Sequence, residues 1–418
     1  MTLRIRWEWD KKWEKWLVCQ KNMVKFADGP ILPYNTLNNM KLLRIFACCS
    51  AIGLFLDLVL SGCASRPNNS EVEVMRVPDL TQTETAVESG LFDRFEPIVL
   101  ETNDSSLITI IEKAEIRNDT IFILDRKNPR LLLFDSTGNF LRNIGSVGDG
   151  PNQYTHCYSF ALNPEKNEVA MIIPFGFLYT YDLQGKFIEN RKLPAKPSYH
   201  DAKWLNKDTL ILWSGVSAAY PAITFLNVPS DKPVRSMWHR QHELNGSISS
   251  FFEVEGKILL GSPYSNEIYS VGMDSIIPIA AWDFGEYNVD MSYFAELDKM
   301  KPSRERYEKY RDDNRAGKIA HRKLEHFGNK RYMVVNVAVG PLGKSTFYKV
   351  FYDRKDKQSH SIVYLTDGVR LMPVFMNEEF MLAYIRDYEL DACQEAFGWD
   401  LDVADDDNPV LVKMYFKK

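Results

Sequence analysis

Histidine and cysteine are scarce in this sequence, and neither forms a recognisable set of metal ligands. There are seven histidines and six cysteines among 418 residues. Four of the cysteines fall within the first 63 residues and no C-x-x-C occurs, which excludes a structural zinc knuckle. His239 and His242 are three residues apart in a polar stretch, where we interpret them as solvated side chains. We therefore expect no metal site and no cofactor.

The sequence motifs of the common enzyme classes are also missing. The chain has no G-x-S-x-G, no H-E-x-x-H, no Walker loop and no dinucleotide fingerprint. Residues 63–418 carry 42 Lys and Arg against 51 Asp and Glu, so they lack the basic footprint of a nucleic-acid-binding protein. We expect no nucleic-acid partner, and we assign no catalytic residue.

What the sequence does contain is a repeat built from short strands. Residues 121–154 predict three strands, with tight turns at Asn128-Pro129 and at Ser136-Thr137-Gly138. The heptapeptide FDSTGNF at Phe134–Phe140 recurs as YDLQGKF at Tyr181–Phe187, an offset of 47 residues. A period of this length, made of antiparallel strands, indicates the blades of a β-propeller.

The length of the chain fits six such blades. Residues 96–418, less an insertion of about 40 residues, divide by this period into about six units. We predict an all-β fold, a six-bladed β-propeller of four-stranded antiparallel blades over residues 95–418. The sixth blade lacks an outermost strand, and we expect Phe95–Leu100 to supply it and close the ring. Asp135 and Asp182 head D-x-x-G turns, where we expect their carboxylates to cap the turn backbone.

Residues 290–330 interrupt the repeat with a highly charged stretch. Apolar residues recur there at helical spacing, at Phe294, Leu297, Met300, Ala320, Leu324 and Phe327. We therefore predict a helical insertion between blades four and five. His321 and His326 fall within it, five residues apart and off a common helical face.

A signal for export precedes the repeats. Lys41 and Arg44 form a short basic region before an apolar run over residues 42–60. The end of this run resembles the lipobox of bacterial lipoprotein precursors, which implies acylation of the cysteine and cleavage before it. The matching positions are Leu60, Ser61, Gly62 and Cys63. Asp57 within the apolar run departs from the pattern, and an uncleaved membrane anchor is the alternative.

The segments on either side of this signal carry no blade pattern. Residues 1–39 hold four tryptophans among charges, and we interpret them as an upstream extension of the reading frame, with synthesis beginning at Met40. A cytoplasmic amphipathic arm is the alternative. Residues 40–62 are then the signal peptide, and residues 63–94 are a tether and N-terminal segment.

The first blade resembles that of the six-bladed β-propeller lipoproteins of Bacteroidetes-type bacteria, which have NHL-like blades. Their pattern is a strand, F-D-x-x-G-x-F, and then a G-x-G-P-x-x-Y turn. It matches Phe134, Asp135, Gly138, Phe140, Gly148, Gly150, Pro151 and Tyr154. Asn152-Gln153 departs from the Gly-Glu pair that is common in that family. The resemblance implies the architecture and a place in the cell envelope, lipid-anchored to the outer membrane and facing the periplasm or the surface. It implies no activity.

Two functions remain open on this basis. The first is a membrane-anchored binding or scaffold module for a glycan, a peptide or a protein partner, with the ligand contacted by loops at one end of the channel. The candidate binding residues are the aromatic side chains Phe175, Phe177, Trp213, Tyr220 and Tyr264. The alternative for each of them is packing between blades. The second function is a lactonase-like hydrolase or lyase with its site in the central channel.

The pattern of the innermost strands favours binding over catalysis. A propeller enzyme needs polar side chains that converge from several of these strands, whereas here the predicted strands begin with apolar or aromatic residues.

Cys157 and Cys393 lie in the first and last parts of the ring, where export would allow a disulfide. We interpret them as two separate buried thiols.

Overall fold

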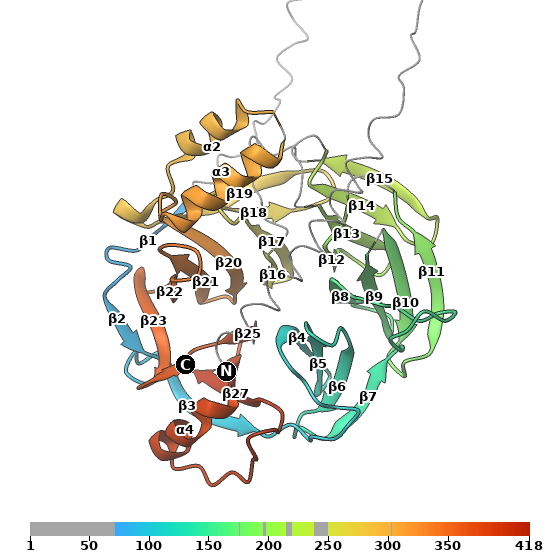
Figure 1. Ribbon diagram of the computed structural model, residues 1–418, viewed down its shortest axis with the longest axis horizontal. Helices are drawn as coiled ribbons and strands as arrows, with labels where there is room; N and C mark the ends of the chain where they lie inside the picture. The colour runs from blue at the N-terminus through green and yellow to red at the C-terminus, as the bar shows by residue number, and fades with distance from the viewer. Residues whose placement is uncertain (1–71, 175, 195–197, 215–219, 238–249, 302) are drawn as a thin grey trace, which may run out of the picture. The chain divides into compact units, whose positions relative to one another are not determined.

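The computed structural model describes residues 72–418, apart from residues 175, 195–197, 215–219, 238–249 and 302. The strands of this part form six sheets that are arranged as blades in a ring (Figure 1). The predicted six-bladed propeller of four-stranded antiparallel blades is therefore confirmed. Residues 69–418 form one compact unit, with their own hydrophobic clusters and their own ring closure. This part of the chain thus holds what it needs to fold by itself.

The first three blades follow the chain in order, from the innermost strand outward. Blade 1 consists of β4 (Ile111–Arg117), β5 (Thr120–Asp125), β6 (Leu131–Asp135) and β7 (Phe140–Ile144). Blade 2 consists of β8 (Ser159–Leu162), β9 (Glu168–Ile173), β10 (Phe177–Asp182) and β11 (Phe187–Lys192). Blade 3 consists of β12 (Asp201–Trp204), β13 (Thr209–Trp213), β14 (Ile223–Asn227) and β15 (Lys232–Met237).

The last three blades each recruit strands from elsewhere in the chain. Blade 4 consists of β16 (Ser250–Val254), β17 (Lys257–Gly261), β18 (Glu267–Val271) and β19 (Ile276–Asp283), with β1 (Glu73–Arg76) added outside. Blade 5 consists of β20 (His321–Gly328), β21 (Tyr332–Val339), β22 (Thr346–Asp353) and β23 (Gln358–Thr366), with β2 (Thr83–Thr85) and β24 (Val369–Arg370). Blade 6 consists of β25 (Pro373–Met376), β26 (Phe380–Ile385), β27 (Val410–Phe416) and β3 (Phe92–Ile98).

The second strand of a blade is apolar on both faces because it is covered on both sides. In β5, Ile121 and Ile123 pack in the cluster shared with blade 6, whereas Phe122 and Leu124 pack in the cluster shared with blade 2. Alternate side chains of a strand point to opposite faces, so a strand between two blades needs a continuous apolar run. This is why residues 121–124 read as an unbroken hydrophobic stretch.

Ring closure joins the two ends of the propeller. β3 pairs with β27 in antiparallel register, with Phe95 opposite Met414, and it is the outermost strand of blade 6. The predicted closing strand near Phe95–Leu100 is confirmed, three residues earlier than expected at its start. Pairing of the two ends removes the free sheet edges that a linear array would leave.

The segment before β3, predicted only as an N-terminal segment without blade pattern, holds two strands, while the predicted tether at residues 64–70 lies outside the described residues. β1 pairs in parallel with β19, and β2 pairs in parallel with β23, so residues 73–85 run along the outside of blades 4 and 5. Met75, Val77 and Leu80 are buried there. β1 and β2 pair in parallel with strands that are far away in the sequence, so no tight turn marks the pairing. The sequence pattern therefore did not reveal these two strands.

The insertion between blades 4 and 5 is shorter than predicted. It holds the 3₁₀ turn η1 (Gly285–Tyr287) and the helices α2 (Met291–Asp298) and α3 (Arg304–Arg315). The prediction of a helix at Ala320–Phe327 is wrong. These residues lie almost wholly in β20, the innermost strand of blade 5. A bulge between Lys323 and His326 breaks the alternation of β20, and the resulting spacing imitates a helix.

The remaining helices lie in blade 6, at the lower left of the ring as drawn, whereas α2 and α3 lie at the upper left (Figure 1). η2 (Asp387–Glu389) and α4 (Leu390–Phe397) connect β26 to β27. No helix in the described part of the chain is long and apolar enough to cross a membrane.

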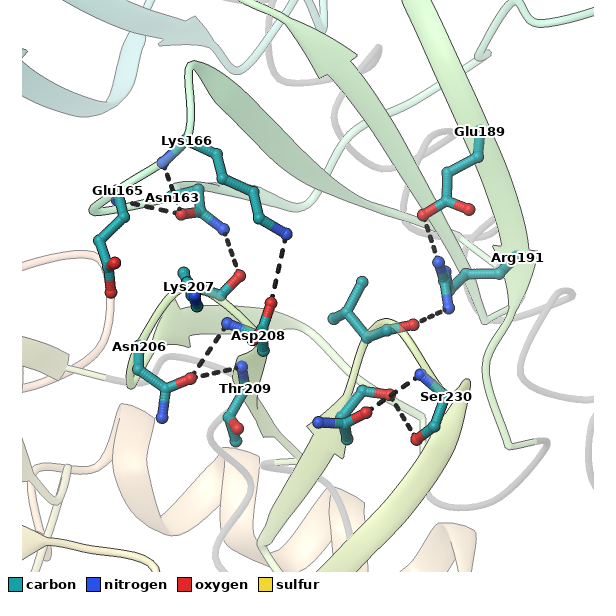
Figure 2. Close-up of polar contacts among 12 residues, drawn as sticks. Asn163, Glu165, Lys166, Glu189, Arg191, Asn206, Lys207, Asp208, Thr209 and Ser230 are labelled. Carbon is teal, nitrogen blue, oxygen red and sulfur yellow. Dashed lines mark hydrogen bonds and ion pairs between the residues drawn. The ribbon is translucent and has the colours of Figure 1, made fainter.

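The turns are capped by short polar side chains, as expected. The Asp135 carboxylate accepts hydrogen bonds from the backbone N–H groups of Thr137 and Asn139, and Asp182 does the same for its own turn. Asn163 plays this role after β8 and also donates its Nδ2 to the carbonyl of Lys207 in blade 3 (Figure 2). These side chains therefore fix both the turns and the contacts between neighbouring blades.

The two faces of the ring are defined by the direction of the innermost strands. We call the face where β4, β8, β12, β16, β20 and β25 begin the leading face. We call the face where they end the trailing face. Lys113 meets Phe160, and Arg117 meets Asn163, which shows that β4 and β8 run the same way. Loops that join second strands to third strands lie at the leading face.

Cys157 and Cys393 are separate free thiols, as interpreted from the sequence. Both are buried, Cys157 in the cluster of blades 1 and 2 and Cys393 in the cluster of blades 5 and 6. Burial raises the pKa of each thiol to about 12. Neither is a reactive thiolate near neutral pH.

Candidate binding site at the leading face

The innermost strands carry charged side chains that converge around the axis. Lys113 and Glu115 lie on β4, Asp201 and Lys203 on β12, and Glu325 on β20. We expected the innermost strands to begin with apolar or aromatic residues, which holds for β4 but not for β12, which begins at Asp201. In β4 and β12 the charges stand two residues apart, as Lys-x-Glu and Asp-x-Lys, and this spacing was the available signal.

Lys113, Ser159 and Asp201 form the polar cluster that lies nearest the leading face. We call this cluster the charged node. The Lys113 ammonium donates to the Phe160 carbonyl at 2.8 Å and to Ser159 Oγ at 3.2 Å, and it lies 3.5 Å from the Asp201 carboxylate. Ser159 Oγ in turn bonds to Asp201. The node thus ties blades 1, 2 and 3 together. It presents a carboxylate and an ammonium side by side.

A second node lies deeper along the axis. Lys203 lies 3.5 Å from Glu115 and 4.0 Å from Glu253 of blade 4. The negative charge of Glu115, more than any other group, raises the pKa of Lys203. The ammonium is therefore held charged between two carboxylates from different blades.

The blade 5 side of the axis carries a carboxylate in an unusual setting. Glu325 accepts a hydrogen bond from Asn336 at 2.7 Å. Its side chain is exposed, yet desolvation by the protein packed around it raises the pKa of the Glu325 carboxyl. Burial also lowers the pKa of the neighbouring Lys349 to about 8.

Three rings stand at the rim, just before the innermost strands begin. Tyr158 precedes β8, and His200 precedes β12. The ring centroid of Tyr158 is 5.5 Å from that of His156 and 5.1 Å from that of His200. Tyr158 is 37% exposed, and burial lowers the pKa of both histidines, so both stay neutral near pH 7. Single-sequence reasoning missed these rings because the residues are separated by the whole of blade 2.

Four of the five aromatic residues predicted for binding are described by the structure, and these four belong to the leading face but differ in exposure. Trp213 at the end of β13 and Tyr264 in the β17–β18 loop are buried, at 1% and 3% exposure. The prediction that Trp213 and Tyr264 are exposed aromatic surfaces for a ligand is therefore corrected. Trp213 packs edge-on against Phe251, and Tyr264 packs beneath Phe294 of α2, with ring centroids 4.8 Å apart.

The other predicted site residues divide into two groups. Phe177 and Tyr220 are half-buried at the leading face and stay predictions. Phe175 lies outside the described residues, and so do the anchor positions Leu60, Ser61, Gly62 and Cys63.

A further polar cluster lies buried between blades 4 and 5. Lys323 donates to the Tyr264 carbonyl, to Asn266 and to His321 Nε2 at 3.1–3.3 Å, while His321 Nδ1 meets the Tyr287 carbonyl at 2.6 Å. Burial lowers the pKa of Lys323 to about 7. The Lys323 nitrogen has three hydrogen-bond partners on blades 4 and 5, so this lysine holds the loops of the two blades together.

The arrangement at the rim suits recognition of a polar ligand. An exposed aromatic ring supplies a stacking surface, and the ion pair below it supplies one donor and one acceptor group. The Ser159 hydroxyl bonds to the Asp201 carboxylate and has no histidine nitrogen as a partner among the described residues, so the triad geometry of a serine hydrolase is not formed by them. Among the described residues, no three His, Cys, Asp or Glu side chains are grouped as a metal-ligand set.

Comparison with known protein families identifies the family to which the propeller belongs. A profile described as "Domain of unknown function (DUF4934)" matches residues 73–415, which is most of the chain. The chain belongs to the DUF4934 family. No curated protein matches the sequence. The match begins at β1, so β1 and β2 are part of the DUF4934 domain and not of a linker.

Solved structures share the fold of this DUF4934 protein. One is a "putative exported protein" of Bacteroides fragilis, with a TM-score of 0.66 and 17% identity over 82% of this chain and 100% of that chain. Another is a member of the DUF4221 family from Bacteroides vulgatus, with a TM-score of 0.50 and 10% identity over 78% of this chain and 97% of that chain. At these identities the likeness shows the six-bladed architecture.

Proposed function

We propose that this DUF4934 protein is an exported binding module, held at the cell envelope by a lipid on Cys63, and that it binds a glycan or peptide at the leading face. The observation that carries the ligand site is the Tyr158 ring, exposed between His156 and His200 at the rim. The next residue, Ser159, bonds to Asp201 and so joins the ring to the charged node.

Two features support export and anchoring. The residues before Cys63 match a lipobox, and the structurally similar Bacteroides fragilis protein is described as exported. Intact-mass measurement of the protein extracted from membranes tests this point. A diacyl or triacyl adduct on a chain that begins at Cys63 is expected, whereas a soluble product that retains Met1 refutes it.

The ligand site is tested with residues 69–418. A thermal-shift screen against neutral oligosaccharides, acidic oligosaccharides and short peptides selects a ligand class, and titration calorimetry then measures affinity. Tyr158→Ala is expected to weaken binding on the order of tenfold, because it removes the stacking surface.

A matched control separates the rim from the rest of the face. Tyr388 is 71% exposed in the β26–β27 connection, at the same face but in blade 6. Tyr388→Ala should leave affinity unchanged. The reverse result, with Tyr388→Ala weakening and Tyr158→Ala unchanged, refutes the rim as the site. Turnover of a panel compound would replace the binding role with the hydrolase or lyase alternative.

A further inference from the structure

The trailing face of blades 4, 5 and 6 is hollowed by an open basin of about 1270 Å³. Its walls are the loops between the first and second strands of these blades, the β22–β23 turn, and the ends of β3 and β27. Lys330, Lys355, Lys357, Lys417, Arg94 and Arg354 are among its lining residues. The basin therefore lies at the end of the ring opposite the rim site.

The basin is positively charged although the body around it is negative. Eight basic side chains line it against five acidic ones, so basic side chains outnumber acidic ones by three. Residues 63–418 as a whole carry nine more acidic than basic residues. The positive excess is thus a local feature of this face and does not follow from composition.

The distribution of ion pairs leaves lysines available in the basin. Glu73 is bound by Arg354 at 3.1 Å and by Lys357 at 2.5 Å, so its charge is already met. Lys330, Lys355 and Lys417 are exposed, and none of them forms an ion pair with any described residue. Asp93, Glu255, Glu378 and Glu379 share the basin and limit its positive charge.

The chain enters the propeller at this same face. Glu73, the first residue of β1, lines the basin. Glu73 lies ten positions after Cys63 in the sequence. A fully extended chain spans at most about 3.6 Å per residue, so the two residues lie within about 35 Å of each other in any conformation. An acylated Cys63 therefore keeps the trailing face near the bilayer.

We infer that the basin docks on the anionic headgroups of the membrane that holds the anchor, with its unpaired lysines bound to lipid phosphates. This inference rests on the proposed anchoring. Basic side chains next to a membrane are attracted by anionic lipids, and the attraction weakens with salt. Docking by this face turns the rim site of Tyr158 away from the bilayer, toward a ligand in solution.

Vesicle partitioning of residues 69–418 tests the inference without the anchor. The probes are phosphatidylcholine vesicles and phosphatidylcholine vesicles that contain phosphatidylglycerol. The basin variant K330E/K355E/K417E is compared with the matched control K127E/K192E/K344E, whose lysines are exposed in leading-face loops or at the leading end of β11. Both variants change net charge equally.

The unaltered fragment should bind only the vesicles that contain phosphatidylglycerol, and more weakly as salt is raised. The basin variant should lose affinity on the order of 100-fold, since each lysine near the surface contributes about a fivefold factor. The control should keep it. Equal losses in both variants, or no loss in either, overturn the inference.

Two further outcomes distinguish membrane docking from a site for a small phosphate compound and from the proposed lipid anchor. Saturable binding of glycerol 1-phosphate to the basin, without vesicle binding, overturns membrane docking in favour of a site for a small phosphate compound. Absence of an acyl group on Cys63 in the mass measurement refutes the anchor alone, because the fragment lacks that residue. The docking and the anchoring therefore fail by different results.

Discussion

A buried histidine makes a sharp prediction about stability and pH. His326 on β20 stacks on Phe252 between blades 4 and 5, with ring centroids 6.0 Å apart and planes at 13°. Neither ring nitrogen has a hydrogen-bond partner among the described residues. Burial, with a smaller contribution from the charge of Lys323, lowers the pKa of His326 from 6.5 to about 3.

The sign of the effect follows from proton binding in the two states. Below about pH 6.5 the unfolded chain protonates this histidine, whereas the folded protein does so only near pH 3. The folded state therefore has its full advantage above pH 6.5 and loses it progressively as the pH falls toward 3. Because each pH unit is worth about 1.4 kcal/mol once the unfolded histidine is protonated, the loss from about pH 7 to pH 5 is about 2 kcal/mol.

His326→Leu removes the titrating ring and keeps an apolar side chain of similar size. Urea unfolding at several pH values gives the free energy of unfolding for both proteins. Between about pH 7 and pH 5, the unaltered protein should lose about 2 kcal/mol more than the variant. The difference measured above pH 7.5 reports packing alone and serves as the internal control. His321 titrates equally in both proteins and cancels. Parallel pH profiles would refute the reasoning.

Three further results are expected. Asp135→Ala should lower the free energy of unfolding by about 1 kcal/mol, and Asp135→Asn by less, because the carboxylate accepts two backbone N–H groups in its turn; urea unfolding measures both. Met75→Ala should cost about 2–3 kcal/mol in the same assay, since this fully buried side chain makes β1 part of the core; an unchanged stability would mean that β1 is only a tether. Cys157 and Cys393 should react with a maleimide only after denaturation, and labelling of the native protein would contradict their burial.

The rim site shows why a functional surface on a propeller is hard to foresee. His156, Tyr158 and His200 come together because two innermost strands lie side by side across a whole blade of sequence. A single sequence shows the spacing within one blade but not which positions of neighbouring blades share a face. Trp213 and Tyr264 look like good stacking residues in the sequence, and only the packing of Phe251 and of α2 over them shows that they are buried.

The repeated blade, the closing strand near Phe95 and the capped turns at Asp135 and Asp182 could be predicted from the amino-acid sequence. These depend on local chemistry: glycine at a turn, a carboxylate within reach of its own backbone, and a continuous apolar run where a strand is covered on both faces. Tertiary structure alone decided the β1 and β2 additions, the strand at His321–Gly328, and the charges that meet at the axis and in the trailing basin. Those features depend on contacts between residues far apart in the chain, as for the buried Lys323, whose hydrogen-bond partners Tyr264 and Asn266 come from blade 4.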